Sequence, residues 1–182
     1  MASRRRSQAA ALVGDPQVRH RGTIGGSLAH GDPASDLPAV LLALDAEIVA
    51  HGPEGERTIA ASDFFKGPFE TALGQREVLT EIRVPKVERG VYLKHVRRAQ
   101  DWATVGVAAA VVGDETRVAL VSMGPTPHRA RGVEAALADG AGARDASDRV
   151  DEGTEPPSDV SGSGAYRAHL AQVYVRRALE QL

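Results

Sequence analysis

The residues best placed to bind a ligand are two glycines, Gly25 and Gly26, in the string Thr23-Ile24-Gly25-Gly26-Ser27. Glycine has no Cβ, so the backbone here can turn sharply and lie close against a ligand. Free N–H groups in such a turn form a concavity that suits a phosphate or a polar ring edge. The spacing matches neither G-x-x-x-x-G-K-[ST] nor G-x-G-x-x-G. A tight turn that binds nothing explains the same residues, and both interpretations stay open.

An apolar helical pattern follows the glycine segment. Leu37, Val40, Leu41 and Leu44 recur at i, i+3, i+4 and i+7, which predicts a helix with one buried face. Asp36, or Ser35 before it, is placed to cap this helix, and Pro38 suits its first turn. The glycines would therefore be held directly before a packed helix.

The remaining pattern predicts two units that meet near residues 85–90: an α/β unit that holds the glycine segment and a second unit that is an α+β layer. Strands are expected at 46–50, 57–60, 77–84, 91–98, 102–112 and 117–123, and helices at 129–138 and 165–182. Residues 139–164 are rich in Gly, Asp, Ser and Pro, which predicts a mobile excursion with little apolar surface to bury.

Alternation along 91–98 places Tyr92 and Lys94 on one face of a strand. A lysine inside a strand needs either solvent or an anionic partner, and solvent exposure is the simpler expectation. Arg19 and Arg21, just before the glycines, could face anionic groups, but surface solvation is slightly favoured for both.

The composition of the chain excludes several classes of function. The net charge of −2 gives no basic footprint for nucleic acid, and the absence of cysteine excludes disulfides, cysteine-bound zinc and cysteine-ligated iron–sulfur clusters. The longest apolar run, 103–112, is too short to span a bilayer, and the N-terminus is a poor signal peptide, so the cytoplasm is the expected location. The six histidines are scattered without the spacing of a metal site. Any redox role therefore needs an organic cofactor or another subunit.

The strings VRHRGTIGGSLAHGDPASDLPAVLLALDA, YLKHVRRAQDWATVGVAAAVV and SGAYRAHLAQVYVRRALEQL carry a resemblance to a known family. The first resembles the second flavin-binding segment of the FAD subunit of molybdenum hydroxylases, the family of carbon monoxide dehydrogenase medium subunits and xanthine dehydrogenase FAD domains. The other two resemble the C-terminal domain of the same flavoproteins. The resemblance covers the chain from about Ala11 onward.

The resemblance implies an α+β fold with two parts. Residues 1–88 would form the second subdomain of a PCMH-type FAD-binding domain. Residues 89–182 would form the flavoprotein C-terminal domain, with a three-stranded antiparallel sheet packed on helices. Nothing upstream of Gly22 resembles the family's first glycine-rich segment, so we expect that segment to be missing through truncation or supplied by a separate chain.

FAD is the implied cofactor. Thr23, Ile24, Gly25, Gly26 and Ser27 match its backbone-and-hydroxyl cradle. Asp36 matches an acidic contact, Leu79 an apolar contact at the ring and Lys94 a polar contact near it. His30 lies in the same segment and could touch FAD.

The implied function is the FAD subunit of a molybdenum hydroxylase. Electrons would arrive from a molybdenum-cofactor large subunit through an iron–sulfur small subunit and leave to an external acceptor. No catalytic acid, base or nucleophile is required of this chain, because the flavin carries the redox chemistry. The alternative is a flavin-free module that keeps only its subunit contacts.

Overall fold

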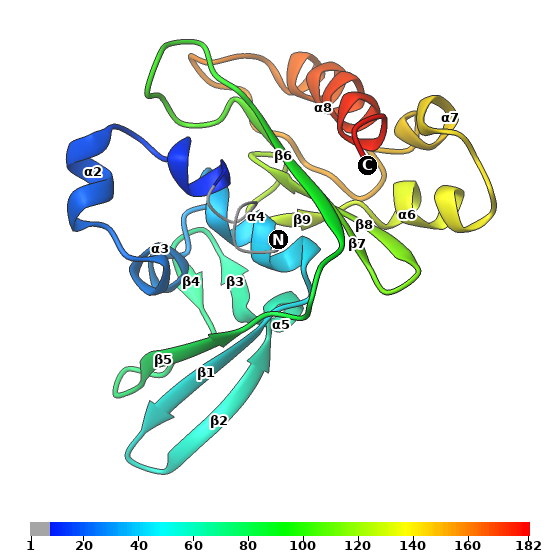
Figure 1. Cartoon of the computed structure of the whole chain (residues 1–182). Helices are drawn as coiled ribbons and strands as arrows, with labels where there is room; N and C mark the ends of the chain where they lie inside the picture. Colours follow the sequence, from blue (N-terminus) through cyan, green and yellow to red (C-terminus); the bar gives the residue numbers. More distant parts are fainter. Residues whose placement is uncertain (1–7) are drawn as a thin grey trace.

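The computed structural model describes residues 8–182 and builds them around three antiparallel sheets (Figure 1). The first sheet has the order β2-β1-β5, the second pairs β3 with β4, and the third has the order β6-β7-β8-β9. The strands are β1 (Glu47–Gly52), β2 (Gly55–Ala60), β3 (Phe65–Gly67), β4 (Glu70–Thr71), β5 (Val78–Arg83), β6 (Arg89–His95), β7 (Val105–Val112), β8 (Glu115–Val121) and β9 (His128–Arg129).

Helices connect and cover these sheets. They are α2 (Pro16–Arg21), α3 (Ile24–His30), α4 (Asp36–Ala43), α5 (Ala61–Phe64), α6 (Arg131–Ala138), α7 (Ala143–Ser147) and α8 (Gly164–Leu179). The α+β class is confirmed. The third sheet has four strands where three were expected, because a short strand, β9, pairs with β8 and places His128 opposite Leu120. No helix in residues 8–182 is long and apolar enough to cross a membrane.

The third sheet lies between two helical layers. Ala108 and Ala110 of β7 join one apolar cluster with α4, while Val107 and Ala109 join another with α6 and α8. This alternation is the two-residue period of a strand. Small alanines on the first face let α4 approach β7 and β8 closely, so a helix of the first half is packed on the sheet of the second.

Ion pairs and a hydrogen bond from this sheet hold both ends of α4. Tyr92 and Lys94 of β6 contact Asp36 at its first residue. Just past its last turn, Asp45 pairs with Arg117 and with Arg129, the latter at 2.6 Å. Because these groups come from strands far along the chain, they fix α4 relative to the sheet at two points.

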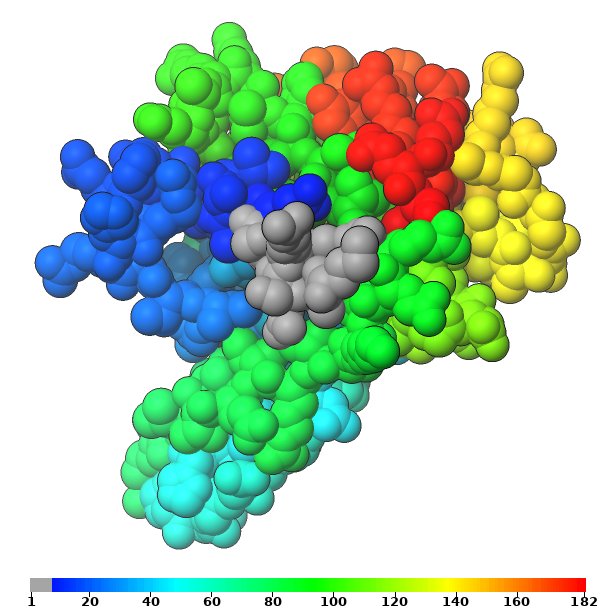
Figure 2. Space-filling model, viewed as in Figure 1, coloured from blue at the N-terminus to red at the C-terminus, as the bar shows by residue number. Residues whose placement is uncertain are grey.

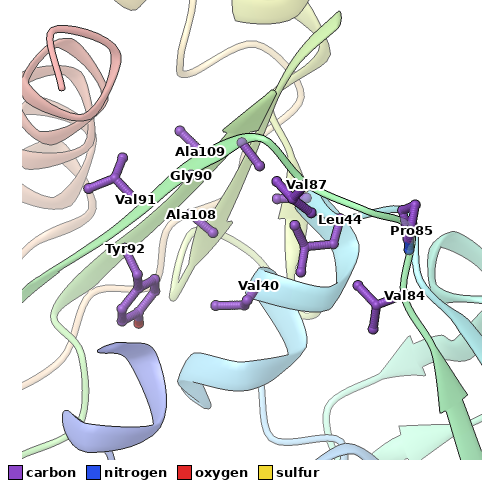
Figure 3. A pocket seen from close by; sticks show the side chains of 12 residues that line it. Val40, Leu44, Val84, Pro85, Val87, Gly90, Val91, Tyr92, Ala108 and Ala109 are labelled. Carbon is purple, nitrogen blue, oxygen red and sulfur yellow. The ribbon is translucent and has the colours of Figure 1, made fainter. Parts of the chain in front are cut away.

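A small apolar cavity lies where the connection from β5 to β6 crosses α4 (Figure 3). Val84, Pro85 and Val87 of the connection face Val40 and Leu44 of the helix there. Its volume is about 40 Å³. Ligand sites in proteins hold roughly 300–1,000 Å³, so this cavity is a packing defect and not a cofactor site.

Two segments differ from the sequence expectation. The strand expected from Trp102 begins only at Val105, which leaves the Trp102 side chain 60% exposed. Residues 139–164 are not a bare excursion: they contain α7, and Ala146 and Val150 are fully buried against the second cluster. These two side chains, the Asp159–Arg167 ion pair and the hydrogen bond from the Glu155 amide to the Met123 carbonyl anchor a segment of polar composition.

The β2-β1-β5 sheet projects from the body as an arm (Figure 2). Near its outer end Arg57 donates two hydrogen bonds of 2.7 Å to Glu77, and the Gly74 amide donates a third of 2.7 Å. The Arg57 hydrogen bonds, followed by that from Gly74, lower the pKa of Glu77 from its usual 4.5 to about 2. The arm therefore contains a carboxylate that is stabilised in its charged form.

We expect this carboxylate to make folding sensitive to acid. Because the folded pKa lies below the unfolded one, its stabilisation is present above about pH 4.5 and is lost as the pH falls toward 2. Glu77→Gln should unfold at a lower temperature than wild type at pH 7, and the difference should shrink by pH 3. If the difference in unfolding temperature between the two proteins is the same at pH 7 and pH 3, the lowered pKa of Glu77 is contradicted.

Candidate functional site

The glycine segment forms the first turn of α3 and not the sharp turn that was expected before a helix. Thr23 is the N-cap, and its hydroxyl accepts a 2.9 Å hydrogen bond from the Gly26 amide. Gly31 ends the helix in the left-handed conformation, with φ +66°. Threonine at the cap and glycine after the last turn are the usual signals for helix ends, and they outweigh the low helix propensity of the glycine pair.

The two glycines have different surroundings. A Cβ on Gly26 would lie 3.0 Å from the Thr23 hydroxyl, so the cap explains why this position is glycine. A Cβ on Gly25 would meet only the Leu79 side chain, at an ordinary 3.6 Å. The fold therefore does not require glycine at 25, and Gly25 and Leu79, both predicted to contact the cofactor, lie next to each other.

A groove of about 700 Å³ runs along this segment. This volume lies within the range of small-molecule sites. Its walls come from the N-terminal residues, α2, α3, the start of α4 and the β6–β7 connection: Ala10, Val13, Val18, Arg19, Arg21, Gly22, Thr23, Ile24, Gly26, Ser27, His30, Ser35, Leu37, Val40, Leu41 and Trp102. Four of the five residues predicted for the cradle are thus brought to one groove.

Apolar side chains are unusually exposed in this groove. Val18 is 51% exposed, Ile24 41% and Trp102 60%. Exposed apolar side chains that gather in a hollow are typical of binding surfaces. Sequence reasoning missed Trp102, since it stands at the head of an apolar run that was assigned to a buried strand. Its place at the edge of that run, directly after the polar Gln100-Asp101, was the only available signal.

Within residues 8–182 the amides of Ile24 and Gly25 form no hydrogen bond, because they stand in the first turn of α3 and the cap is taken by Gly26. They are donors without a protein acceptor beside a hollow. This arrangement fits the polar part of a dinucleotide, while the apolar walls fit a planar ring.

Asp36 and Lys94, also predicted as contacts, lie together but outside the lining of this groove. Lys94 Nζ donates to Asp36 Oδ2 at 2.9 Å and to the Leu12 carbonyl at 3.0 Å, and the Tyr92 hydroxyl donates to Asp36 Oδ1. The Lys94 side chain is only 6% exposed, so the expectation of solvent exposure was wrong. Asp36 is the first residue of α4 and Ser35 its N-cap, but neither side chain caps the helix.

Burial raises the pKa of the Asp36 carboxyl, against the opposing effect of its hydrogen bonds from Lys94 and Tyr92. Burial, and then the neighbouring Asp36 charge, raises the pKa of Tyr92 well above its usual value. Tyr92 therefore stays a hydrogen-bond donor at neutral pH. The cluster is a buried ion pair with an added hydrogen bond, the arrangement in which such a pair is tolerated.

Side chains at the groove rim are more ordinary. Arg19 and Arg21 are exposed, as favoured from the sequence, and Arg19 donates to the Val13 carbonyl at 2.8 Å. His30 lines the groove, with its ring 5.1 Å from that of the exposed Phe69. No group of three potential metal-ligating side chains occurs in the part of the chain that the structure describes.

Two family models match the chain. Residues 2–87 match the FAD binding domain in molybdopterin dehydrogenase, and residues 91–182 match the CO dehydrogenase flavoprotein C-terminal domain. The groove and the Thr23–Ser27 segment lie mainly in the first match, and Trp102 and Lys94 lie in the second.

Curated relatives align over nearly the whole chain. The carbon monoxide dehydrogenase medium chain of Hydrogenophaga pseudoflava is 39% identical over 95% of this chain, and the glyceraldehyde dehydrogenase medium chain of Sulfolobus acidocaldarius is 40% identical over 93%. The alignments cover 64% of each relative, so the chain spans less than two thirds of their length.

A solved structure agrees. Carbon monoxide dehydrogenase from Hydrogenophaga pseudoflava, in a form lacking the Mo-pyranopterin moiety, superposes with a TM-score of 0.88 and 40% identity. The superposition covers 96% of this chain and 65% of that one. The chain therefore belongs to the FAD-binding medium-subunit family of the molybdenum hydroxylases.

Proposed function

We propose that this chain binds FAD in the groove beside α3 and serves as the flavin subunit of a molybdenum hydroxylase. Electrons would come from a molybdenum-cofactor large subunit through an iron–sulfur small subunit, and an external acceptor would remove them. One observation carries the proposal: a hollow of cofactor size lies against the Thr23–Ser27 segment, which is inside the match to the FAD-binding family.

The residues present fit the cofactor in chemistry. Thr23, Ile24, Gly25, Gly26 and Ser27 would supply amides and hydroxyls to its polar part. Leu79 lies beside Gly25 and outside the lining of the groove, and it would contact the ring from there. Bound FAD would supply the redox chemistry, and this chain would orient it and exclude water.

Asp36 and Lys94 would contribute at the base of the site. The carboxylate of Asp36 is 5% exposed and hydrogen-bonded at both oxygens, so its neighbours Ser35 and Leu37 present the groove surface at this point. We place the complete assembly in the cytoplasm.

The alternative function is an interaction module without flavin. The exposed Val18, Ile24 and Trp102 favour it, because an apolar hollow also suits the surface of another subunit. The two functions differ in whether a small planar ligand enters the groove.

Trp102 provides the test, because it is the single tryptophan of the chain and it lines the groove. Titration of the purified chain with FAD should quench Trp102 emission saturably, through energy transfer to the flavin, and should give the flavin a visible circular dichroism signal. Riboflavin, which lacks the pyrophosphate and adenine, should bind more weakly. Quenching equal to that of free tryptophan, with no induced dichroism, would favour the flavin-free module.

A further inference from the structure

Two walls of the groove meet at one buried ammonium group. Ala10 and Val13 form one wall, and Ser35 and Leu37 at the start of α4 form another. Lys94 of β6 donates to the Leu12 carbonyl in the first wall and to the Asp36 carboxylate in the second, at 3.0 and 2.9 Å. These two contacts join Lys94 to residues that lie 82 and 58 positions away in the sequence.

The neighbouring strand, β7, has a glycine where the Tyr92–Asp36–Lys94 cluster needs space. Gly106 pairs with Lys94 in the β6–β7 register and is the one glycine in a strand otherwise made of valine and alanine. A Cβ at 106 would lie 2.6 Å from the Tyr92 hydroxyl oxygen. The glycine therefore leaves room for Tyr92 to reach Asp36 beside Lys94.

We propose that Lys94 and Tyr92 are positioning residues for the cofactor groove: Lys94 ties the 10–13 segment to the start of α4, and Tyr92 holds Asp36 in place. This inference rests on the proposed function and assigns Lys94 an action through Leu12 and Asp36 in place of a direct contact with the flavin ring. A preformed groove binds more tightly, since its walls need no ordering when the ligand arrives.

Three variants separate positioning from general stability. Lys94→Met removes both ties and leaves the Asp36 charge buried without its cation. Asp36→Asn/Lys94→Met removes the buried charge and keeps an acceptor for Tyr92, but it does not restore the tie to Leu12. Arg129→Met, the matched control, removes a 9% exposed cation from Asp45 at the other end of α4.

We expect Lys94→Met to lower the unfolding midpoint and to raise the FAD dissociation constant about tenfold. The double variant should recover most of the midpoint while its affinity stays weak. Arg129→Met should lower the midpoint and leave the affinity within about twofold. The reduction potential of the flavin that remains bound to Lys94→Met should equal that of wild type.

Two results would overturn the inference. Affinity that follows the unfolding midpoint across the three variants would make the cluster merely structural. A changed potential in Lys94→Met would place the ammonium at the ring.

Amide exchange in the FAD-free chain tests the tie by itself. Leu12 and Val13 donate to the carbonyls of Ala9 and Ala10. Their amides should exchange faster in both Lys94 variants and at the wild-type rate in Arg129→Met. Unchanged exchange would refute the tie whether or not FAD binds, and a wild-type chain that shows protection but no FAD binding would refute only the proposed function.

Discussion

Gly25→Ala should make the chain more stable and its FAD binding weaker. Gly25 is helical, and its added methyl would meet only Leu79, at 3.6 Å. Alanine in a helix is favoured over glycine by about 0.5–1 kcal/mol, with the lower value apt for a first turn. For a chain of this size that corresponds to a rise of about 1–3 °C in the unfolding midpoint.

The methyl group would at the same time project from one proposed cofactor contact, residue 25, toward another, Leu79. We expect a loss of at least about tenfold in FAD affinity, because a buried ligand cannot shift by an ångström without losing its hydrogen bonds. The same Trp102 quenching titration measures this loss. Opposite changes in stability and affinity would show that the glycine serves the ligand and not the fold.

Gly26→Ala is the control for this experiment. Its Cβ would lie 3.0 Å from the Thr23 hydroxyl that caps the helix, so this variant should be destabilised. Wild-type affinity in Gly25→Ala would remove Gly25 from the cradle. A lower unfolding midpoint in Gly25→Ala than in wild type would show that the backbone at 25 is not helical.

Local signals in the sequence predicted much of this fold. The 3.6-residue pattern predicted α4, and the apolar runs at 102–112 and 117–123 predicted β7 and β8, which pair as a hairpin around Gly113 at φ +60°. The alternation of 91–98 placed Tyr92 and Lys94 on one face, and both do contact the same carboxylate.

Errors arose where a distant residue decides the local state. The local sequence predicts an exposed Lys94, because its partner Asp36 lies 58 positions away in the sequence. Glycine propensity argued against a helix at 25–26, and only the Thr23 cap together with the packing of Leu28, which is fully buried, reverses that preference. Trp102 was misplaced because an apolar run does not reveal where its strand begins.

Gly106→Ala should produce the largest loss of stability. The new Cβ would lie 2.6 Å from the Tyr92 hydroxyl oxygen and 2.9 Å from Val121 Cγ2, inside a fully packed sheet. Overpacking of a core costs typically 1–3 kcal/mol, and displacing Tyr92 from Asp36 adds roughly 1.5–3 kcal/mol for a hydrogen bond to a charged group. The unfolding midpoint should therefore fall by on the order of 10 °C.

The variant pair Gly106→Ala and Tyr92→Phe identifies the cause. Tyr92→Phe removes the hydroxyl that the new methyl would strike, and by itself it costs Asp36 one donor. Because both single changes act on the same hydrogen bond, the double variant should be clearly more stable than the sum of the two single losses predicts. Denaturant unfolding of the four proteins measures this coupling. Additive losses would mean that Val121, and not the Tyr92–Asp36 contact, is what requires glycine at 106, and the small residue would then reflect sheet packing alone.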